Sequence, residues 1–110
     1  MKNNNSLVQI KKGALEYCVL AVINEGEKYG YEIVKILTQR GMTTREGTIY
    51  PLLSRLLKDR LVEAAWRETD GGVPRKYYLI TDKGLASLRE FKESWSEYSE
   101  IVDSILREVN

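Results

Sequence analysis

Apolar residues recur about every third or fourth position in the first part of the chain, which is the spacing of amphipathic helices. The first expected helix starts near Val8 or Ile10 and ends at Asn24, and we expect the polar residues before it to form a frayed tail. Because apolar residues lie on most of its sides, this helix must be covered on most sides. The second expected helix begins around residues 29–31 and ends at Gly41.

A third amphipathic segment follows a linker at residues 42–47. Its apolar side chains repeat at helical spacing without a miss: Ile49, Leu52, Leu53, Leu56 and Leu57. Pro51 interrupts this pattern, because proline has no N–H to donate inside a helix. If Thr48 is the N-cap, Pro51 lies in the first turn, where it does no harm. A start near Thr44 would instead require a local distortion at Gly47, and the sequence leaves both starts open.

Two β-favouring runs come next, at residues 61–68 and 75–80. The turn sequence Asp70-Gly71-Gly72 between them predicts a hairpin. Thr81 then caps a long final helix that we expect to reach Val109. Three helices followed by a two-stranded ribbon is the order of a winged helix-turn-helix. The sequence therefore predicts a mainly α fold with a small two-stranded β wing and a long C-terminal helix.

The final helix carries a heptad repeat of large apolar residues. Its core positions are Leu88, Phe91, Trp95, Tyr98, Val102, Ile105 and Val109. This stripe either packs on its own domain or forms a seam with a second chain, and we favour the second because the stripe is longer than so small a domain needs. We expect residues 1–80 to form the DNA-binding domain and residues 81–110 a homodimerisation helix within the same compact unit.

Charge is distributed unevenly although the net charge is only +1. Residues 1–80 hold 13 Lys and Arg against 9 Asp and Glu, whereas residues 81–110 hold 4 against 7. A basic body with an acidic tail predicts that only the body faces phosphate.

The chain has no histidine and no phosphate-binding glycine loop, so we expect no enzyme, no metal site and no cofactor. With no long apolar run, we expect no membrane contact and a cytoplasmic location.

The single cysteine, Cys18, lies in an apolar run. It is expected to be a buried structural thiol, the alternative being a redox sensor, which needs an exposed thiolate of low pKa.

Residues expected to face DNA lie on the third helix, on the hairpin tip and at the start of the first helix. Those on the outward side of the third helix are Thr48, Tyr50, Ser54, Arg55 and Lys58. Hydroxyls and cations suit phosphates and base edges, although a solvated helix would carry the same residues. At the hairpin tip, Arg75 and Lys76 follow glycines that allow close approach to DNA, and Lys11 and Lys12 could reach flanking phosphates.

Four stretches resemble the PadR family of bacterial regulators, in the short form with one C-terminal helix. They are residues 12–16 (Lys-Gly-Ala-Leu-Glu), 29–33 (Tyr-Gly-Tyr-Glu-Ile), 47–56 (Gly-Thr-Ile-Tyr-Pro-Leu-Leu-Ser-Arg-Leu) and 75–84 (Arg-Lys-Tyr-Tyr-Leu-Ile-Thr-Asp-Lys-Gly). Residues 91–96 also resemble a multidrug-responsive branch of the family. The sequence departs from the family at Arg60, where glycine is usual, so Arg60 must avoid a positive φ or adopt it at a cost of roughly 1 kcal/mol.

The resemblance implies a dimer with the first and last helices at its interface, and a repressor of a detoxification or transport operon or of its own gene. Its operator would be double-stranded DNA with an inverted repeat. The resemblance places Tyr50, Pro51, Ser54 and Arg55 on the recognition helix, Gly72, Arg75 and Lys76 on the wing, and Trp95 at a site for a planar aromatic effector. The alternative is a winged helix that binds another protein and no DNA.

Overall fold

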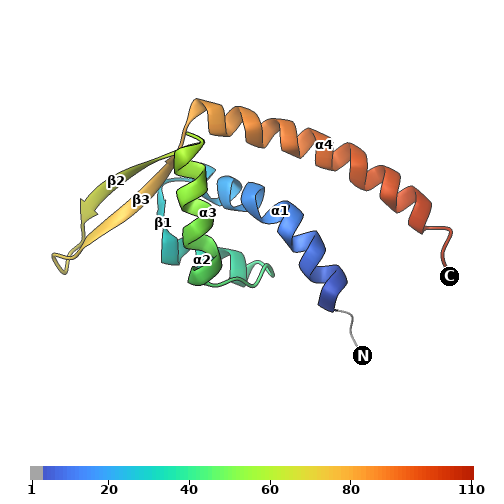
Figure 1. The fold of residues 1–110 in the computed structure, drawn as a ribbon, viewed down its shortest axis with the longest axis horizontal. Coiled ribbons are helices and arrows are strands. Elements are labelled where there is room, and N and C mark those ends of the chain that lie inside the picture. The colour runs from blue at the N-terminus through green and yellow to red at the C-terminus, as the bar shows by residue number, and fades with distance from the viewer. Residues whose placement is uncertain (1–3) are drawn as a thin grey trace.

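The computed structural model describes residues 4–110, with side chains from residue 14 onward. The predicted phosphate contacts Lys11 and Lys12 therefore lie outside the described side chains. In chain order the elements are α1 (Asn4–Asn24), β1 (Lys28–Tyr29), α2 (Gly30–Gln39), α3 (Glu46–Lys58), β2 (Val62–Glu68), β3 (Pro74–Ile80) and α4 (Asp82–Leu106) (Figure 1). Within residues 4–110, none of the helices combines the length and the apolar character needed to cross a membrane.

The sheet has three strands rather than the predicted two. Its order is β1-β3-β2, with both pairs antiparallel. The apolar pattern did not predict β1, whose residues Lys28 and Tyr29 pair with Tyr78 and Tyr77. Two residues are too short to show alternation of polar and apolar positions, so the pattern could not reveal them. The hairpin of β2 and β3 is confirmed within one residue at each strand start.

The hydrophobic core lies between the first three helices and the sheet, and α1 is central to it. The buried apolar residues are Leu15, Val19, Leu20, Val22, Ile23, Ile33, Leu37, Ile49, Leu52, Leu53, Leu56, Leu61, Val62 and Tyr78. From α4, Leu88 packs against this core. In Figure 1 the rest of α4 runs past α1 and extends away from the body. The broad apolar surface predicted for the first helix is thus covered by α2, α4 and the sheet.

Two helix ends differ from the sequence prediction. The first helix begins at Asn4, not near Val8 or Ile10, because hydrophobic periodicity marks where a helix packs and not where it begins. The last helix ends at Leu106, short of Val109. The backbone N–H of Val109 donates to Leu106 O at 3.0 Å, three residues back, which is the tightened turn of a fraying helix end.

The start of α3 decides between the two possibilities left open for Pro51. The helix begins at Glu46 with Arg45 as its N-cap, so Pro51 lies inside the helix and not in its first turn. Pro51 cannot donate to the carbonyl of Gly47, four residues earlier. Both residues are exposed, so water can reach that carbonyl. Arg45 O accepts from the N–H groups of Thr48 at 3.0 Å and Ile49 at 3.1 Å, which secures the first turn.

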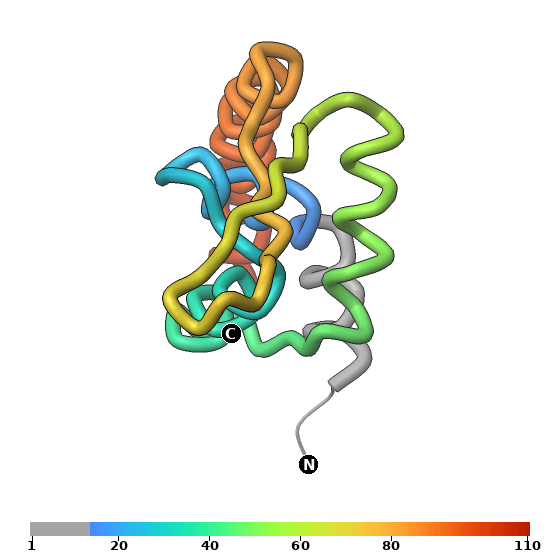
Figure 2. The backbone as a smooth tube through the Cα atoms, turned by 90° about the vertical axis from the view of Figure 1, so that its left-hand side faces the viewer, coloured from blue at the N-terminus to red at the C-terminus, as the bar shows by residue number. Residues whose placement is uncertain are grey.

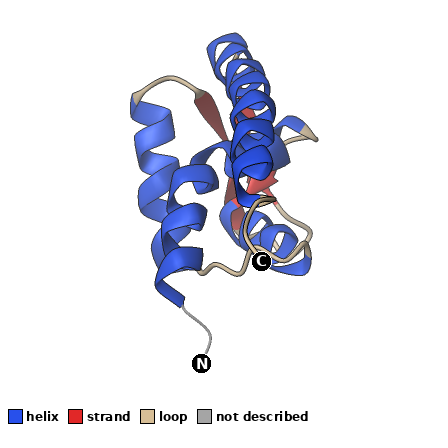
Figure 3. Ribbon diagram, turned by 90° about the vertical axis from the view of Figure 1, so that its right-hand side faces the viewer, coloured by secondary structure: helices blue, strands red, loops and turns tan. Residues whose placement is uncertain are grey.

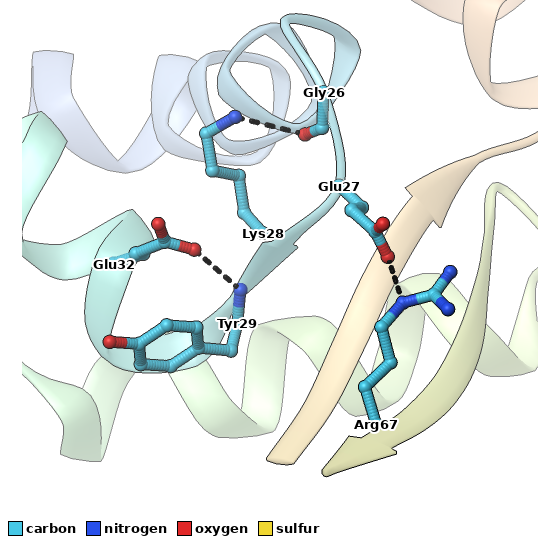
Figure 4. Close-up of polar contacts among 6 residues, drawn as sticks. All are labelled: Gly26, Glu27, Lys28, Tyr29, Glu32 and Arg67. Atoms are coloured by element: carbon cyan, nitrogen blue, oxygen red, sulfur yellow. Dashed lines mark hydrogen bonds and ion pairs between the residues drawn. The ribbon is translucent and has the colours of Figure 1, made fainter. Parts of the chain in front are cut away.

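Two polar contacts fix β1 between α2 and the wing (Figure 4). The backbone N–H of Tyr29 donates to Glu32 Oε1 at 3.2 Å, which is one half of a capping box at the start of α2. On the wing side, the guanidinium of Arg67 pairs with the carboxylate of Glu27. These contacts hold the start of α2 beside the hairpin.

The start of α4 is joined tightly to the end of α3. The Thr81 hydroxyl accepts from the backbone N–H of Gly84 at 3.0 Å, as predicted for an N-cap, and donates to Arg60 O at 2.8 Å. Gly84 is buried, and a Cβ added to it would lie 2.0 Å from the carbonyl oxygen of Leu61. This position therefore excludes any side chain.

Arg60 has a φ of +61°, which lies in the left-handed region that favours glycine. Glycine is the residue that the resemblance described above leads us to expect at this position. A Cβ in this region clashes with the neighbouring carbonyl, so Arg60 carries strain that glycine would not.

Replacing Arg60 with glycine should therefore stabilise the fold by about 1 kcal/mol. Urea unfolding of wild type and Arg60→Gly at one protein concentration measures the difference in free energy of unfolding. The control Arg60→Ala keeps the Cβ and should give no such gain. Equal stability of Arg60→Gly and wild type would show that no strain is stored at this residue.

Candidate nucleic-acid interface

A cleft of 720 Å³ separates α3 from the hairpin. Figure 2 shows these two elements side by side, with α3 in green and the hairpin in yellow. The residues that line the cleft are Tyr29, Gly30, Tyr31, Tyr50, Ser54, Trp66, Arg75, Lys76 and Tyr78. Four predicted DNA contacts, two from the helix and two from the wing, thus share one cleft with aromatic walls.

On the wing side, aromatic rings hold both predicted cations. The Arg75 guanidinium lies 4.5 Å from the centre of the Tyr29 ring, and Lys76 Nζ lies 5.8 Å from that of Tyr78. A cation over an aromatic face is attracted by the ring quadrupole. Trp66, which pairs with Lys76 across the strands, is 67% exposed. The wing therefore presents two oriented cations beside a bare indole.

On the helix side, Tyr50 packs across the start of α2. A Cβ on Gly30 would lie 2.4 Å from Tyr50 Cε1, so the ring needs glycine at that position. The Tyr50 hydroxyl donates to Glu46 Oε2 at 3.1 Å. Burial, and then this hydrogen bond, raise the pKa of Tyr50, so its hydroxyl keeps its proton at neutral pH.

The predicted outward face of α3 is divided between two sides. Tyr50 and Ser54 line the cleft beside the wing. Thr48, Pro51 and Arg55 instead line a hollow of 380 Å³ next to α1. There Arg55 Nη2 donates to Glu16 Oε1 at 2.8 Å. Lys58 is exposed in the last turn of the helix.

The tip of the hairpin depends on one left-handed residue. Gly72 has a φ of +77°, and its N–H donates to Thr69 O at 2.8 Å. The Thr69 hydroxyl donates to Val73 O at 3.0 Å and closes the turn. The glycine predicted at the wing is thus required by the turn itself.

The heptad stripe of α4 divides into a packed part and an exposed part. Leu88 packs on the core, and Phe91 stacks on Tyr17 with ring centroids 4.0 Å apart. The ring centroids of Phe91 and Trp95 are 5.9 Å apart. The exposed apolar residues that follow on α4 and at the C-terminus are Trp95, Tyr98, Ile101, Ile105, Leu106 and Val109. Val102 is half-buried, and Figure 1 shows this part of α4 standing clear of the other elements, while Figure 3 views the molecule from the C-terminal end of α4.

Cys18 fits the expectation of a structural thiol better than that of a redox sensor. Its side chain is half-buried on α1. Burial raises the pKa of the Cys18 thiol, and the charge of Arg40 lowers it by less. A thiol with a raised pKa holds little thiolate at neutral pH.

Among the side chains of residues 14–110, no three or more His, Cys, Asp or Glu gather in a way that could hold a metal.

Comparison with known proteins identifies the family to which this chain belongs. The sequence profile of the transcriptional regulator PadR-like family matches residues 19–90. The chain belongs to the PadR-like family. The crystal structure of a PadR-like transcriptional regulator from Bacillus cereus is 46% identical, with a TM-score of 0.82 over 89% of this chain and 96% of that chain. The resemblance predicted from the sequence is confirmed, while the multidrug-responsive branch stays a prediction.

Two further matches to this PadR-like chain are a curated protein and a solved structure. The transcriptional regulator YqjI of Escherichia coli is 33% identical over 84 residues, which are 74% of this chain and 39% of that protein. The structure of Bacillus subtilis PadR in complex with operator DNA shares the fold, with a TM-score of 0.65 and 24% identity. That match covers 70% of this chain and 45% of the other.

Proposed function

We propose that this PadR-like regulator is a repressor that binds double-stranded operator DNA as a homodimer. In this arrangement α3 enters a major groove and the hairpin reaches the adjacent minor groove. The observation that carries the proposal is the cleft in which Tyr50 and Ser54 face Arg75 and Lys76. The fold shared with an operator-bound PadR supports it. A repressor acts on the chromosome, so we also propose a cytoplasmic location.

The cleft has the chemistry needed for one sugar–phosphate strand. When a helix lies in the major groove and a wing in the minor groove, the backbone between the two grooves must pass between them. Hydroxyls and cations bind phosphate oxygens, and exposed aromatic rings offer apolar surface on which the sugars can pack. We therefore add Tyr31 and Trp66, which are 52% and 67% exposed, to the DNA contacts predicted from the sequence. Tyr31 lies at the start of α2 and Trp66 lies on β2. The sequence pattern did not predict a DNA contact at either residue.

The exposed stripe of α4 supports the homodimer. A contiguous apolar surface on a projecting helix is costly in water and is typical of an interface. A two-fold dimer built on this helix would carry two copies of α3 related by symmetry. Such a pair matches an inverted repeat with half-sites about 34 Å apart, or a multiple of that distance.

Replacing Arg75 and Lys76 together with glutamine should weaken binding to any duplex, because both are proposed to contact phosphate. The plot of log affinity against log salt concentration should become shallower by about one unit for each phosphate that is no longer neutralised. The matched control Arg89→Gln with Lys92→Gln removes the same charge from α4 and should leave that slope unchanged. A loss of operator binding alone, with an unchanged slope, would show that the wing reads bases instead.

Charging the α4 stripe should disrupt the dimer. Val102→Asp with Ile105→Asp places carboxylates in the proposed seam, and sedimentation at micromolar concentration should then show monomers or unfolded chains. Ser104→Asp adds charge to the opposite side of the same turn and should leave the dimer intact. A folded monomer of the wild-type protein under these conditions would contradict the proposed assembly.

We further propose that a planar aromatic effector binds between the two chains at Trp95. The stack of Tyr17, Phe91 and Trp95 supports this, because it ends in an indole that is 48% exposed on the proposed seam. Stacking on an indole adds roughly 0.5–1.5 kcal/mol beyond burial of area. An effector that prefers one dimer spacing would change operator affinity by that preference. The regulated gene would then be a detoxification or transport operon, or the regulator's own gene.

Titration with acridine, a planar aromatic probe, should quench Trp95 fluorescence saturably. Trp66 also emits, so the titration uses Trp66→Phe, with Trp66→Phe plus Trp95→Ala as the control that should lose the signal. Adding acridine to the complex of wild-type protein and operator should lower operator affinity more than it does for Trp95→Ala, because acridine also intercalates into DNA. Quenching that persists without Trp95, or binding that leaves operator affinity unchanged, would contradict the proposed effector site. Trp95 would then be only an apolar packing residue of the dimer interface.

A further inference from the structure

An ion pair joins the recognition helix to α1. Arg55 Nη2 on α3 donates to Glu16 Oε1 on α1 at 2.8 Å. The Glu16 side chain is 27% exposed, whereas the Arg55 side chain is 56% exposed. The less exposed partner is therefore the anion, and more than half of the arginine side chain remains open to solvent.

The pair is not needed to hold α3 in the fold. Ile49, Leu53 and Leu56 are all fully buried and attach this helix to the core. An ion pair with so exposed a member contributes little to stability. A carboxylate beside a surface that approaches phosphates also opposes binding. The position of Glu16 thus has a cost for DNA binding and little benefit for folding.

The geometry leaves Arg55 able to bind a base while it stays paired. The contact with Glu16 takes one of the two Nη2 hydrogens, and Arg55 has no other hydrogen bond or ion pair among the described residues. The second Nη2 hydrogen therefore still forms a parallel pair with the neighbouring hydrogen of Nη1 or Nε. Arginine reads guanine by donating two parallel hydrogen bonds to O6 and N7. A guanidinium that is already held loses less conformational freedom when it makes this contact.

We propose that Glu16 is a positioning residue that fixes the Arg55 guanidinium for recognition of a guanine in the major groove. This inference rests on the proposed DNA-binding function and deepens it. Glu16 acts on specificity through Arg55 and does not itself touch DNA. The neighbouring Tyr17 stacks on Phe91 of α4, so the backbone that carries Glu16 is itself anchored.

The test compares two duplexes in gel-shift titrations at matched salt, using the full-length protein. One carries the inverted repeat that the wild-type protein selects from a pool of random duplexes, and the other is a scrambled duplex of equal length and composition. Glu16→Ala should weaken binding to the first about tenfold. Binding to the scrambled duplex should stay unchanged or tighten by up to about threefold, because one negative charge is removed. Glu16→Gln keeps an acceptor oxygen and should recover part of the specificity.

Two controls separate positioning from a structural effect. Glu25→Ala removes the carboxylate of another ion pair, that with Arg40, and should leave the ratio of the two affinities unchanged. In an Arg55→Ala background, Glu16→Ala should cause no further loss of specificity. Circular dichroism confirms that each variant is folded.

Equal changes on both duplexes, tighter operator binding by Glu16→Ala, or an effect that persists without Arg55 would each overturn the positioning role. Wild-type protein that does not distinguish the two duplexes would instead overturn the proposed function, and this inference with it.

Discussion

The end of α3 and the start of α4 meet in a joint with no spare room, and the relation between the two ends of the molecule depends on it. Gly84 lies so close to the Leu61 carbonyl that no side chain fits between them. Thr81 binds the backbone of both segments, and Lys83 Nζ donates to Asp59 O at 3.0 Å. The helix proposed to read DNA is thereby fixed in direction relative to the helix proposed to form the dimer.

A second connection runs through α1. Val19 and Leu20 have no exposed surface, so this helix lies wedged among its neighbours. One side of it stacks on α4 through Tyr17, and the adjacent Glu16 pairs with Arg55 of α3. Close-packed elements shift as units and not by gradual deformation. In the proposed dimer, a change in how the two α4 helices pack would therefore reach α3 by two routes. The proposed effector would act only through such a difference between states.

The sequence predicted the order of the elements and the wing because both follow from local patterns. Apolar spacing marked α3, and the glycines of the hairpin tip marked its turn. The pattern missed β1 because two residues are too few to show a period. It left the start of α3 open because Pro51 is compatible with two different first residues of that helix. Arg60 was the informative exception, because a departure from glycine predicted strain that its positive φ now shows.

The candidate site was predictable in composition but not in layout. Spacing identified the exposed positions of α3, yet it could not say that Tyr50 would face the wing and Arg55 would face α1. That division depends on which element packs on each flank, which is tertiary information. The pairing of Glu16 with Arg55 joins residues 39 positions apart, and no local pattern encodes it. Trp66 and Tyr31 were missed for the same reason.

In the proposed dimer, α4 holds two copies of α3 at a fixed separation, and changing the spacing of the operator half-sites tests this arrangement. Affinity would be measured for the natural inverted repeat and for a duplex with about 5 base pairs inserted between the half-sites, which is half a helical turn. We expect two chains per natural duplex, bound in one step, and a large loss of affinity on insertion. Equal affinity for both duplexes, with each half-site binding one chain independently, would contradict a fixed separation.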